Sequence, residues 1–353
     1  MKIYLNAYIA QNLGDDLFLD MLLKRYSNHE FYAITQIKNN YSYPNLHLYH
    51  NPFLYKFLKK FRLEKYIANR FDMVVTIGGS MFIENPNTSY DLSMGKKDRY
   101  ILGINVGPYE TKEYYTAVQN AFRKCKDVCF REKYSYHLFQ DLPNVRLAPD
   151  IAFGLDTSHL TITNRKRAII SVISCDYKLK ENHNHDGILL ASTYESKMVE
   201  FIERLIKEEY EIVLLSMCKS QGDSEAVNCI FDKCNQKLQD KIQKYEYQGN
   251  IEEALNLFAD SSLIVGSRLH ANIIGLALGK TIIPLVYSDK TIHILEDILE
   301  NSVSEKPLIV DIRNIEQWDV PAIKKEDLTR IIPIGDTRIQ AQEHFKKLDE
   351  VLL

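Results

Sequence analysis

Short apolar runs alternate with amphipathic segments along this chain, and the alternation occurs twice. Such alternation is typical of parallel sheets whose strands are joined by helices. The first half predicts strands at residues 2–8, 31–35, 73–77, 101–106, 128–131 and 145–147, with helices at 15–26, 55–70, 112–124 and 132–139. The second half predicts strands at 168–174, 212–217, 263–265 and 282–286, with helices at 196–209, 224–237, 251–259 and 269–278. We therefore expect two Rossmann-like, doubly wound α/β domains.

The length of 353 residues also favours two domains, because it exceeds what one hydrophobic core usually supports. The polar segment 156–166 has no apolar periodicity and is the expected linker. We assign the N-terminal domain to residues 1–156 and the C-terminal domain to residues 167–335, and we expect 336–353 to pack back across the pair. Two such domains facing each other would form a cleft, which is where a ligand is expected.

Composition excludes several classes of function. A hydrophobic content of 45% with 26% charged residues is that of a soluble globular protein, and the net charge of -3 does not favour a nucleic-acid-binding protein. No signal peptide or membrane-spanning run is recognisable, so we expect a cytoplasmic protein. The six cysteines have no paired CxxC spacing and are expected to be reduced core residues, so the sequence gives no support for a metal site.

The junction at residues 262–270 is the strongest indication of a functional site. An apolar strand ends there, and Ser267, Arg268 and His270 occupy the turn into the next helix. Ligands bind at the carboxyl ends of parallel strands, and free N–H groups at a helix start favour anions. The sequence therefore predicts an anion-handling site. The alternative is structural: an arginine paired with a carboxylate and a histidine at a helix cap.

Three further turns follow predicted strands in the first half. Asn12, Gly14, Asp15 and Asp16 lie between the first strand and its helix; Gly78, Gly79 and Ser80 follow a buried strand; and Arg131 ends another strand. We expect these residues to line the cleft, where glycine permits close approach of a ligand or a neighbouring chain segment. Asp15 as a helix cap, a plain tight turn at Gly78 and a surface ion pair at Arg131 are the structural alternatives.

Taken in order, these motifs resemble those of the polysaccharide pyruvyl transferase family. The family pattern has an N-x-G-D turn, a D-x-V-V-x-x-G-G-[GS] strand end, a G-x-x-x-G-P strand, an R-E-x-x-S segment, a D-P-[AI]-like strand end and an S-R-L-H junction. The corresponding residues are 12–15, 72–80, 103–108, 131–135, 149–152 and 267–270. Two departures are Ser80 in place of a third glycine and the order Pro149-Asp150.

The resemblance implies a fold similar to glycosyltransferase GT-B and transfer of a carboxyethylidene group from phosphoenolpyruvate to two hydroxyls of a sugar. It implies donor binding by Arg268, Arg131 and Ser267, protonation of the enol methylene by His270, and deprotonation of a sugar hydroxyl by Asp15, with Asp16 as the fallback. Asn12, Gly14, Gly78, Gly79 and Ser80 would line the acceptor side. No metal or organic cofactor is required, and the product would be a cell-surface polysaccharide bearing a pyruvate ketal.

Two other segments bear on partners. Cations alternate with aromatic and aliphatic residues over 55–71, a pattern typical of an interfacial basic helix, which would suit a lipid-linked acceptor and a peripheral position at the inner face of the membrane. An ordinary core-facing helix with a solvated basic face is the alternative. The polar loop 175–187, with its H-x-H-D at residues 183–186, is expected to be a solvated loop that can close over a sugar rather than a metal site.

Two rival functions stay open at this point. A GT-B-like glycosyltransferase would bind a nucleotide sugar, with Arg268 on the pyrophosphate and residues 249–255 on the nucleoside. A non-catalytic sugar-binding protein would keep the fold and lack turnover. The combination of Asp15, Arg131, Arg268 and His270 argues against the second of these.

Overall fold

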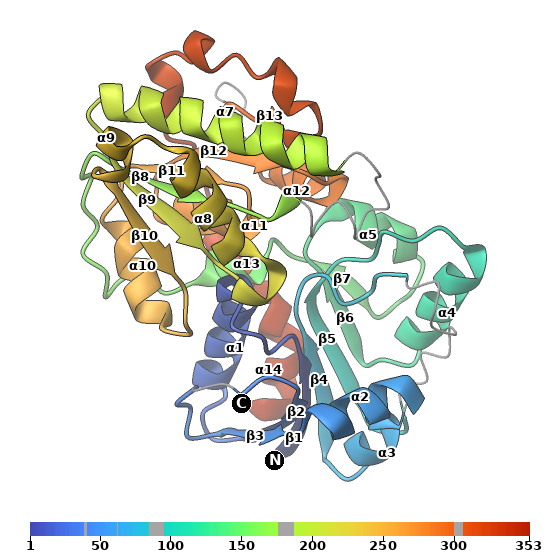
Figure 1. Cartoon of the computed structure of the whole chain (residues 1–353). Coiled ribbons are helices and arrows are strands. Elements are labelled where there is room, and N and C mark those ends of the chain that lie inside the picture. The colour runs from blue at the N-terminus through green and yellow to red at the C-terminus, as the bar shows by residue number, and fades with distance from the viewer. Residues whose placement is uncertain (39–40, 62, 85–94, 176–186, 300–305) are drawn as a thin grey trace. The chain divides into compact units, whose positions relative to one another are not determined.

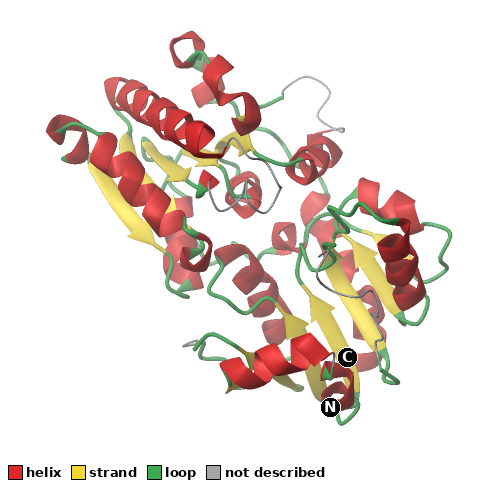
Figure 2. Ribbon diagram, turned by 45° about the vertical axis from the view of Figure 1, so that its right-hand side comes forward, coloured by secondary structure: helices red, strands yellow, loops and turns green. Residues whose placement is uncertain are grey.

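The computed structural model describes the chain except for residues 39–40, 62, 85–94, 176–186 and 300–305. It divides into two compact units. Unit 1 comprises residues 1–10, 15–155 and 336–353, and unit 2 comprises residues 11–14 and 156–335. Each unit is an α/β layer structure in which helices flank a parallel sheet (Figures 1 and 2), so the predicted fold class is confirmed.

Unit 1 has a seven-stranded sheet of order β3-β2-β1-β4-β5-β6-β7, and all of its strand pairs are parallel. Its central strands are the apolar runs of the sequence, and every residue of β4 and β5 is buried. The strands are β1 Lys2–Ala7, β2 Glu30–Thr35, β3 Leu46–His50, β4 Met73–Ile77, β5 Arg99–Ile104, β6 Asp127–Phe130 and β7 Val145–Leu147.

The helices of unit 1 are α1 Leu13–Arg25, which begins in unit 2, and then α2 Pro52–Phe61, α3 Glu64–Ala68, α4 Lys112–Phe122 and α5 Lys133–Phe139. The C-terminal segment adds α13 Thr337–Ala341, a 3-10 turn and α14 Lys346–Leu352. It lies beside α1, as Figure 1 shows, where Arg25 forms an ion pair with Asp349 at 2.6 Å. This segment is therefore an integral part of unit 1.

Unit 2 repeats the same winding in a six-stranded sheet of order β10-β9-β8-β11-β12-β13, again with parallel pairs. Its strands are β8 Arg167–Ser171, β9 Glu211–Ser216, β10 Ile242–Glu246, β11 Leu263–Gly266, β12 Thr281–Val286 and β13 Val310–Asp311. Its helices are α7 Gly187–Lys207, α8 Asp223–Lys233, α9 Gln236–Gln239, α10 Ile251–Ala259, α11 Leu269–Ala277 and α12 Asp289–Leu299. In the part of the chain that the structure describes, no helix is both long and apolar enough to cross a bilayer.

Several predicted elements differ from the structure. The single helix expected over residues 55–70 is wrong, because two helices, α2 and α3, occupy that stretch. Helix α7 begins at Gly187, well before the expected start at residue 196. Strands β3, β10 and β13 were not predicted; each lies at a sheet edge, where partly exposed strands lack a continuous apolar run.

Candidate functional site

The predicted site residues other than Arg131, which follows β6, come after strands at which each sheet reverses its strand order. The order turns between β1 and β4 in unit 1 and between β8 and β11 in unit 2. Such switch points open a crevice at the carboxyl ends of the strands, where α/β proteins bind ligands. Asp15, Gly78 and Gly79 lie at the first switch point, and Ser267, Arg268 and His270 at the second.

Arg131 is held in a buried polar clamp in unit 1. Its Nη1 donates to Asp150 Oδ2 at 2.9 Å, and its Nη2 donates to Asn105 Oδ1 at 2.7 Å. The side chain of Arg131 is 2% exposed and that of Asp150 is fully buried. Among the described residues, Nε of Arg131 has no hydrogen-bond partner. The surface ion pair considered as an alternative is therefore wrong: this guanidinium is buried and fixed at the strand end.

Glycines bring the backbone of unit 1 close to this clamp. A Cβ built on Gly79 would overlap the guanidinium of Arg131, and the Gly79 carbonyl accepts a hydrogen bond from the Asn105 N–H at 3.0 Å. Gly78 has a φ of +144°, and a Cβ there would lie 3.7 Å from Asp15 Oδ1. The Gly-Gly pair thus lies between the Asp15 carboxylate and the Arg131 guanidinium.

The two neighbouring aspartates of α1 differ in their surroundings. Asp16 is 1% exposed, and the Tyr41 hydroxyl donates a hydrogen bond to its Oδ1 at 2.5 Å. Asp15 is only partly buried. The environment therefore favours Asp15 over Asp16 as a group that can meet a ligand.

The rest of the R-E-x-x-S segment has a structural role. Glu132 is the N-cap of α5 and accepts hydrogen bonds from the Ser135 N–H at 2.9 and 3.0 Å. The Ser135 hydroxyl in turn accepts the Val106 N–H at 2.8 Å. These bonds fix the start of α5 and the loop after β5, and so they fix the strand end that presents Arg131.

Arg268 occupies a second clamp, in unit 2, with the same types of partner. Its Nε donates to Asp223 Oδ2 at 3.0 Å, its Nη2 donates to Asp223 Oδ1, and its Nη1 donates to Gln221 Oε1 at 2.5 Å. Asp223 is fully buried and also accepts the Cys218 N–H at 2.9 Å. Burial alone would lower the pKa of Arg268, but the charge of Asp223 and the hydrogen bonds to it raise the pKa above its ordinary value.

Ser267 is buried beside Arg268, and its hydroxyl forms a hydrogen bond with the Tyr194 hydroxyl at 3.0 Å. Burial raises the pKa of Tyr194 well above its usual range, so this phenol stays neutral. On the next turn, Asn272 Nδ2 donates to the Gly266 carbonyl at 2.9 Å and locks the strand-to-helix junction. Ser267 therefore helps to fix the turn.

His270 is partly buried and lies against the segment 11–14, which belongs to unit 2. A Cβ on Gly14 would overlap the imidazole ring. The side chain of Asn12 accepts the Gly14 N–H at 3.2 Å, and the Leu13 N–H donates to the Met217 carbonyl at 3.2 Å. The N-x-G-D turn thus shapes the surroundings of His270.

The structure brings the expected residues into two groups, Asp15 with Gly78, Gly79 and Arg131, and Asn12 and Gly14 with Ser267, Arg268 and His270. Convergence of Arg131 and Arg268 across a cleft stays a prediction. Sequence reasoning missed Asn105, Gln221, Asp223 and Tyr194, and gave Asp150 no role. A signal existed for Asp223, because Gly222-Asp223-Ser224 follows an apolar strand and opens a helix.

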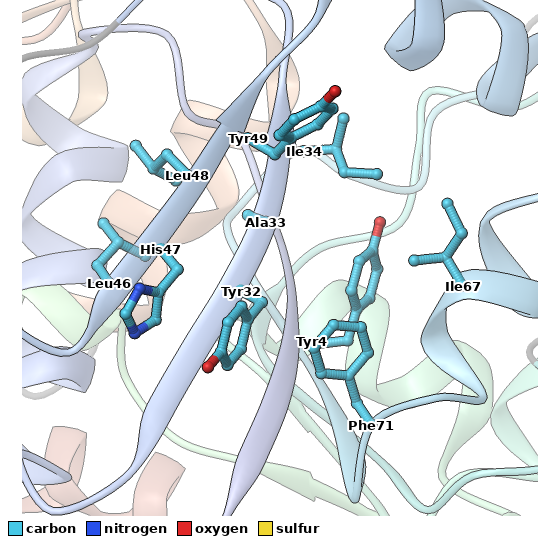
Figure 3. Close-up of a pocket in the computed structure, with 10 residues that line it drawn as sticks. All are labelled: Tyr4, Tyr32, Ala33, Ile34, Leu46, His47, Leu48, Tyr49, Ile67 and Phe71. Atoms are coloured by element: carbon cyan, nitrogen blue, oxygen red, sulfur yellow. The ribbon is translucent and has the colours of Figure 1, made fainter.

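A pocket of about 580 Å³ lies elsewhere in unit 1, on the edge of its sheet. Figure 3 shows its lining, in which Tyr4, Tyr32 and Phe71 meet below Ile67 of α3. The Tyr32 ring lies 5.3 Å from that of Phe71 and stacks on His47 at 4.5 Å. None of the predicted site residues lines it. The pocket therefore lies apart from the residues that are expected to carry the chemistry at the strand ends.

Across the described residues, no three His, Cys, Asp or Glu side chains gather in a way that could hold a metal ion. The H-x-H-D loop lies outside the described residues. Five of the six cysteines are buried. Burial raises the pKa of the Cys125 and Cys129 thiols to about 12, so both remain protonated core groups.

The model of the polysaccharide pyruvyl transferase family matches residues 12–289. This chain belongs to that family. The match contains each motif described above, from the N-x-G-D turn to the S-R-L-H junction. The family is named for a transferase activity on polysaccharides, and the resemblance of the motifs is confirmed.

One similar protein is the amylovoran biosynthesis protein AmsJ of Erwinia amylovora, which is 23% identical over 250 residues. The match covers 65% of this chain and spans 60% of the length of AmsJ.

Similar solved structures include the UDP-GlcNAc 2-epimerase of Methanocaldococcus jannaschii in complex with UDP-GlcNAc and UDP, at 12% identity and a TM-score of 0.61, covering 99% of this chain and 100% of that one. Anabaena HepE in complex with UDP and glucose has 11% identity and a TM-score of 0.53, with 99% and 98% covered. At these identities the likeness concerns the fold, two parallel α/β sheets of the GT-B kind.

Proposed function

We propose that this protein is a ketal-forming pyruvyltransferase that moves the carboxyethylidene group of phosphoenolpyruvate onto two hydroxyls of a sugar in polysaccharide biosynthesis. The observation that supports it most is the pair of matching arginine clamps, Arg131 with Asp150 and Asn105, and Arg268 with Asp223 and Gln221. A donor that carries both a carboxylate and a phosphate needs two cationic groups in fixed geometry.

The clamps leave donor groups for a ligand. A guanidinium has five N–H groups. Of those on Arg131, the bonds to Asp150 and Asn105 use two, and of those on Arg268, the bonds to Asp223 and Gln221 use three. The buried carboxylates balance the charge of each arginine, so the proposed recognition depends on oriented N–H groups more than on net charge. A fixed fork loses little entropy when it binds a planar carboxylate.

In the proposed reaction, His270 donates a proton to the methylene carbon of the donor. The first sugar hydroxyl attacks the resulting cationic C2 while Asp15 accepts its proton. Phosphate then leaves C2, and the second hydroxyl attacks to close the ketal ring, its proton passing to the released phosphate. The proton on Asp15 returns to His270 through solvent, so one phosphoenolpyruvate and one diol give one ketal and one phosphate and the enzyme is restored. The scheme uses no metal or organic cofactor.

We also propose that the acceptor is lipid-linked and that the reaction takes place at the inner face of the membrane, with contact through residues 55–71. Phosphoenolpyruvate is a cytoplasmic metabolite, which supports that side of the membrane.

The proposal is tested by phosphate release from phosphoenolpyruvate against a panel of galactosyl, mannosyl and glucosyl acceptors, with the ketal identified by NMR. Turnover of UDP- or CMP-sugars with no use of phosphoenolpyruvate would contradict the proposal and indicate a glycosyltransferase. No turnover with any donor would indicate a sugar-binding protein.

His270→Gln is expected to keep the fold and most donor binding, because both arginines remain, but to lower turnover by about two to four orders of magnitude. The wild-type rate should fall at acid pH as Asp15 is protonated and at alkaline pH as His270 loses its proton. Turnover by the variant at the wild-type rate, with the alkaline fall unchanged, would leave His270 as a structural residue.

Arg268→Lys is expected to weaken donor binding strongly, because an ammonium group cannot reproduce the planar contacts with Asp223 and Gln221 or present a fork to the donor. Isothermal titration with phosphoenolpyruvate measures the loss. Arg313→Lys, a change at an exposed arginine of the same unit, is the matched control. Equal affinity in wild type and Arg268→Lys would exclude Arg268 from the donor site.

A further inference from the structure

Helix α2 presents a row of phenylalanines to solvent. Phe53, Phe57 and Phe61 are 87%, 51% and 55% exposed. They are spaced four residues apart, so they lie on one face of the helix. The rings of Phe57 and Phe61 contact each other at 4.8 Å between centroids. Single exposed apolar residues are ordinary, but a contiguous aromatic row marks an interaction surface.

This row does not anchor the helix. Leu58 is buried and anchors α2 on a different face, about 100° round the helix from the phenylalanine row, and the Leu54 N–H donates to Asn51 Oδ1 at 2.8 Å at the helix start. None of the three phenylalanines lines the pocket beneath α3. The burial of Leu58 and the hydrogen bond to Asn51 therefore account for the position of α2 without the three phenylalanine rings.

Cations accompany the aromatic row. Lys56 and Lys60 are exposed, and residues 52–61 include three lysines and no acidic residue. The ammonium group of Lys60 lies 5.7 Å from the centroid of the Phe61 ring. On α3, Tyr66 is 61% exposed, with the Lys65 ammonium 5.6 Å from its ring. Aromatic rings and cations thus alternate along the surface of both helices.

We propose that α2 lies in the interface of an anionic lipid bilayer, with Phe53, Phe57 and Phe61 among the acyl chains and Lys56 and Lys60 at the headgroups. An apolar row flanked by cations matches the boundary between acyl chains and anionic headgroups. Lysine stems can lie along the apolar region while their ammonium groups stay in water. This inference deepens the membrane contact proposed above and assigns it to particular residues; it does not depend on the pyruvyl chemistry.

The experiment is flotation of the full chain with vesicles of phosphatidylcholine alone or mixed with phosphatidylglycerol. Wild type should bind the mixed vesicles, and the binding should weaken as salt is raised, because salt screens the lysines. Lys56→Gln with Lys60→Gln should lower the partition coefficient by roughly thirtyfold. Phe53→Ser with Phe57→Ser should lower the partition coefficient by more than about tenfold, because two rings that would be buried among the acyl chains are lost.

Matched controls come from the C-terminal segment of the same unit. Ile339→Ser removes a side chain that is 72% exposed, and Lys346→Gln with Lys347→Gln removes two exposed lysines. Both controls should bind as wild type does, and thermal unfolding should show that all variants are folded.

Equal binding by the α2 variants and wild type, or no binding by wild type, would overturn the inference. So would a wild-type oligomer that becomes monomeric in the phenylalanine variant without vesicle binding, because the occupant would then be a second copy. Phosphoenolpyruvate turnover with a water-soluble acceptor should be unchanged in every α2 variant. That assay separates failure of this inference from failure of the proposed reaction.

Discussion

At the scale of single residues, two glycines determine where two charged side chains can lie. Gly79 leaves the space occupied by the Arg131 guanidinium, and Gly14 leaves the space occupied by the His270 imidazole. Both glycines belong to turns that were recognised in the sequence as places of close approach. The group that approaches is a side chain from later in the chain, and only the folded structure could identify it.

We predict that Gly79→Ala displaces Arg131, because the new methyl group would occupy the position of the guanidinium between Asp150 and Asn105. The expected loss of stability is about 1–3 kcal/mol, typical of forcing a group into a packed site. Phosphate release from phosphoenolpyruvate should fall at least as far as in an Arg131→Lys variant measured in the same assay.

The control is Gly279→Ala. Gly279 has a φ of +65° and no atom within 4 Å of an added Cβ, so the substitution strains the backbone without touching Arg131. The free energy of unfolding of the Gly279→Ala variant should fall, while its turnover of phosphoenolpyruvate stays at the wild-type level. If Gly79→Ala lost stability and kept full turnover, Arg131 would not be part of the donor site.

The partners of the arginines were harder to foresee than the arginines. Asp223 is 45 positions from Arg268, and Asn105 is 26 positions from Arg131. No local pattern links such residues, because parallel sheets bring distant strand ends together. The motifs predicted which residues would carry the chemistry, and the fold shows which carboxylate or amide orients each arginine.

At the scale of elements, buried strands and amphipathic helices were predictable, and most edge strands were not. β4 and α10 have the predicted bounds, because an unbroken apolar run marks the strand and a clear helical period marks the helix. β7 is the edge strand that the sequence did predict. β3 and β10 expose much of their length, so their sequences resemble loops. The predicted helix over 55–70 is divided before Leu63, which is the N-cap of α3, and an averaged periodicity does not reveal such a boundary.

The R-E-x-x-S motif illustrates how one element serves a site. Arg131 is the proposed functional group, while Glu132 and Ser135 hold the first turn of α5 and the loop after β5. A motif of five residues therefore contains both a buried cation and the bonds that position it. The sequence suggested one surface ion pair for the same residues, because burial cannot be read from the motif alone.

At the scale of the whole molecule, the C-terminal segment contacts the part of unit 1 that holds Arg131. His344 is fully buried, and its Nε2 forms a hydrogen bond with the Pro149 carbonyl at 2.9 Å. Pro149 precedes Asp150, the carboxylate that holds Arg131. Through this hydrogen bond the C-terminal segment fixes the backbone next to Asp150, and so it helps to position the partner of Arg131.

We predict that His344 makes the stability of unit 1 sensitive to acid. Burial lowers the pKa of His344 to about 4, whereas an unfolded histidine titrates near about 6.5. Between these values the unfolded chain binds a proton that the folded chain does not. The free energy of unfolding should therefore be fully maintained above about pH 6.5 and should fall by roughly 3 kcal/mol as the pH drops to about 4.

Urea unfolding at pH 7, 6 and 5 measures this slope. His344→Gln retains a donor for the Pro149 carbonyl and cannot titrate, so its stability should vary less with pH. His137→Gln removes an exposed histidine of the same unit and should keep the wild-type slope. Equal slopes in wild type and His344→Gln would refute the assignment.

Unit 1 is discontinuous: it combines residues 1–10, 15–155 and 336–353. Protein synthesis proceeds from the N-terminus, so the ribosome delivers all of residues 156–335 before α14 exists to contact Arg25 of α1 and the adjacent Tyr26. During that interval unit 2 can complete its own sheet while the earlier-made strands still lack their final helix. The nascent chain therefore exposes the α1 face of unit 1 until α14 has been made, and a chaperone that acts on this protein should engage that face.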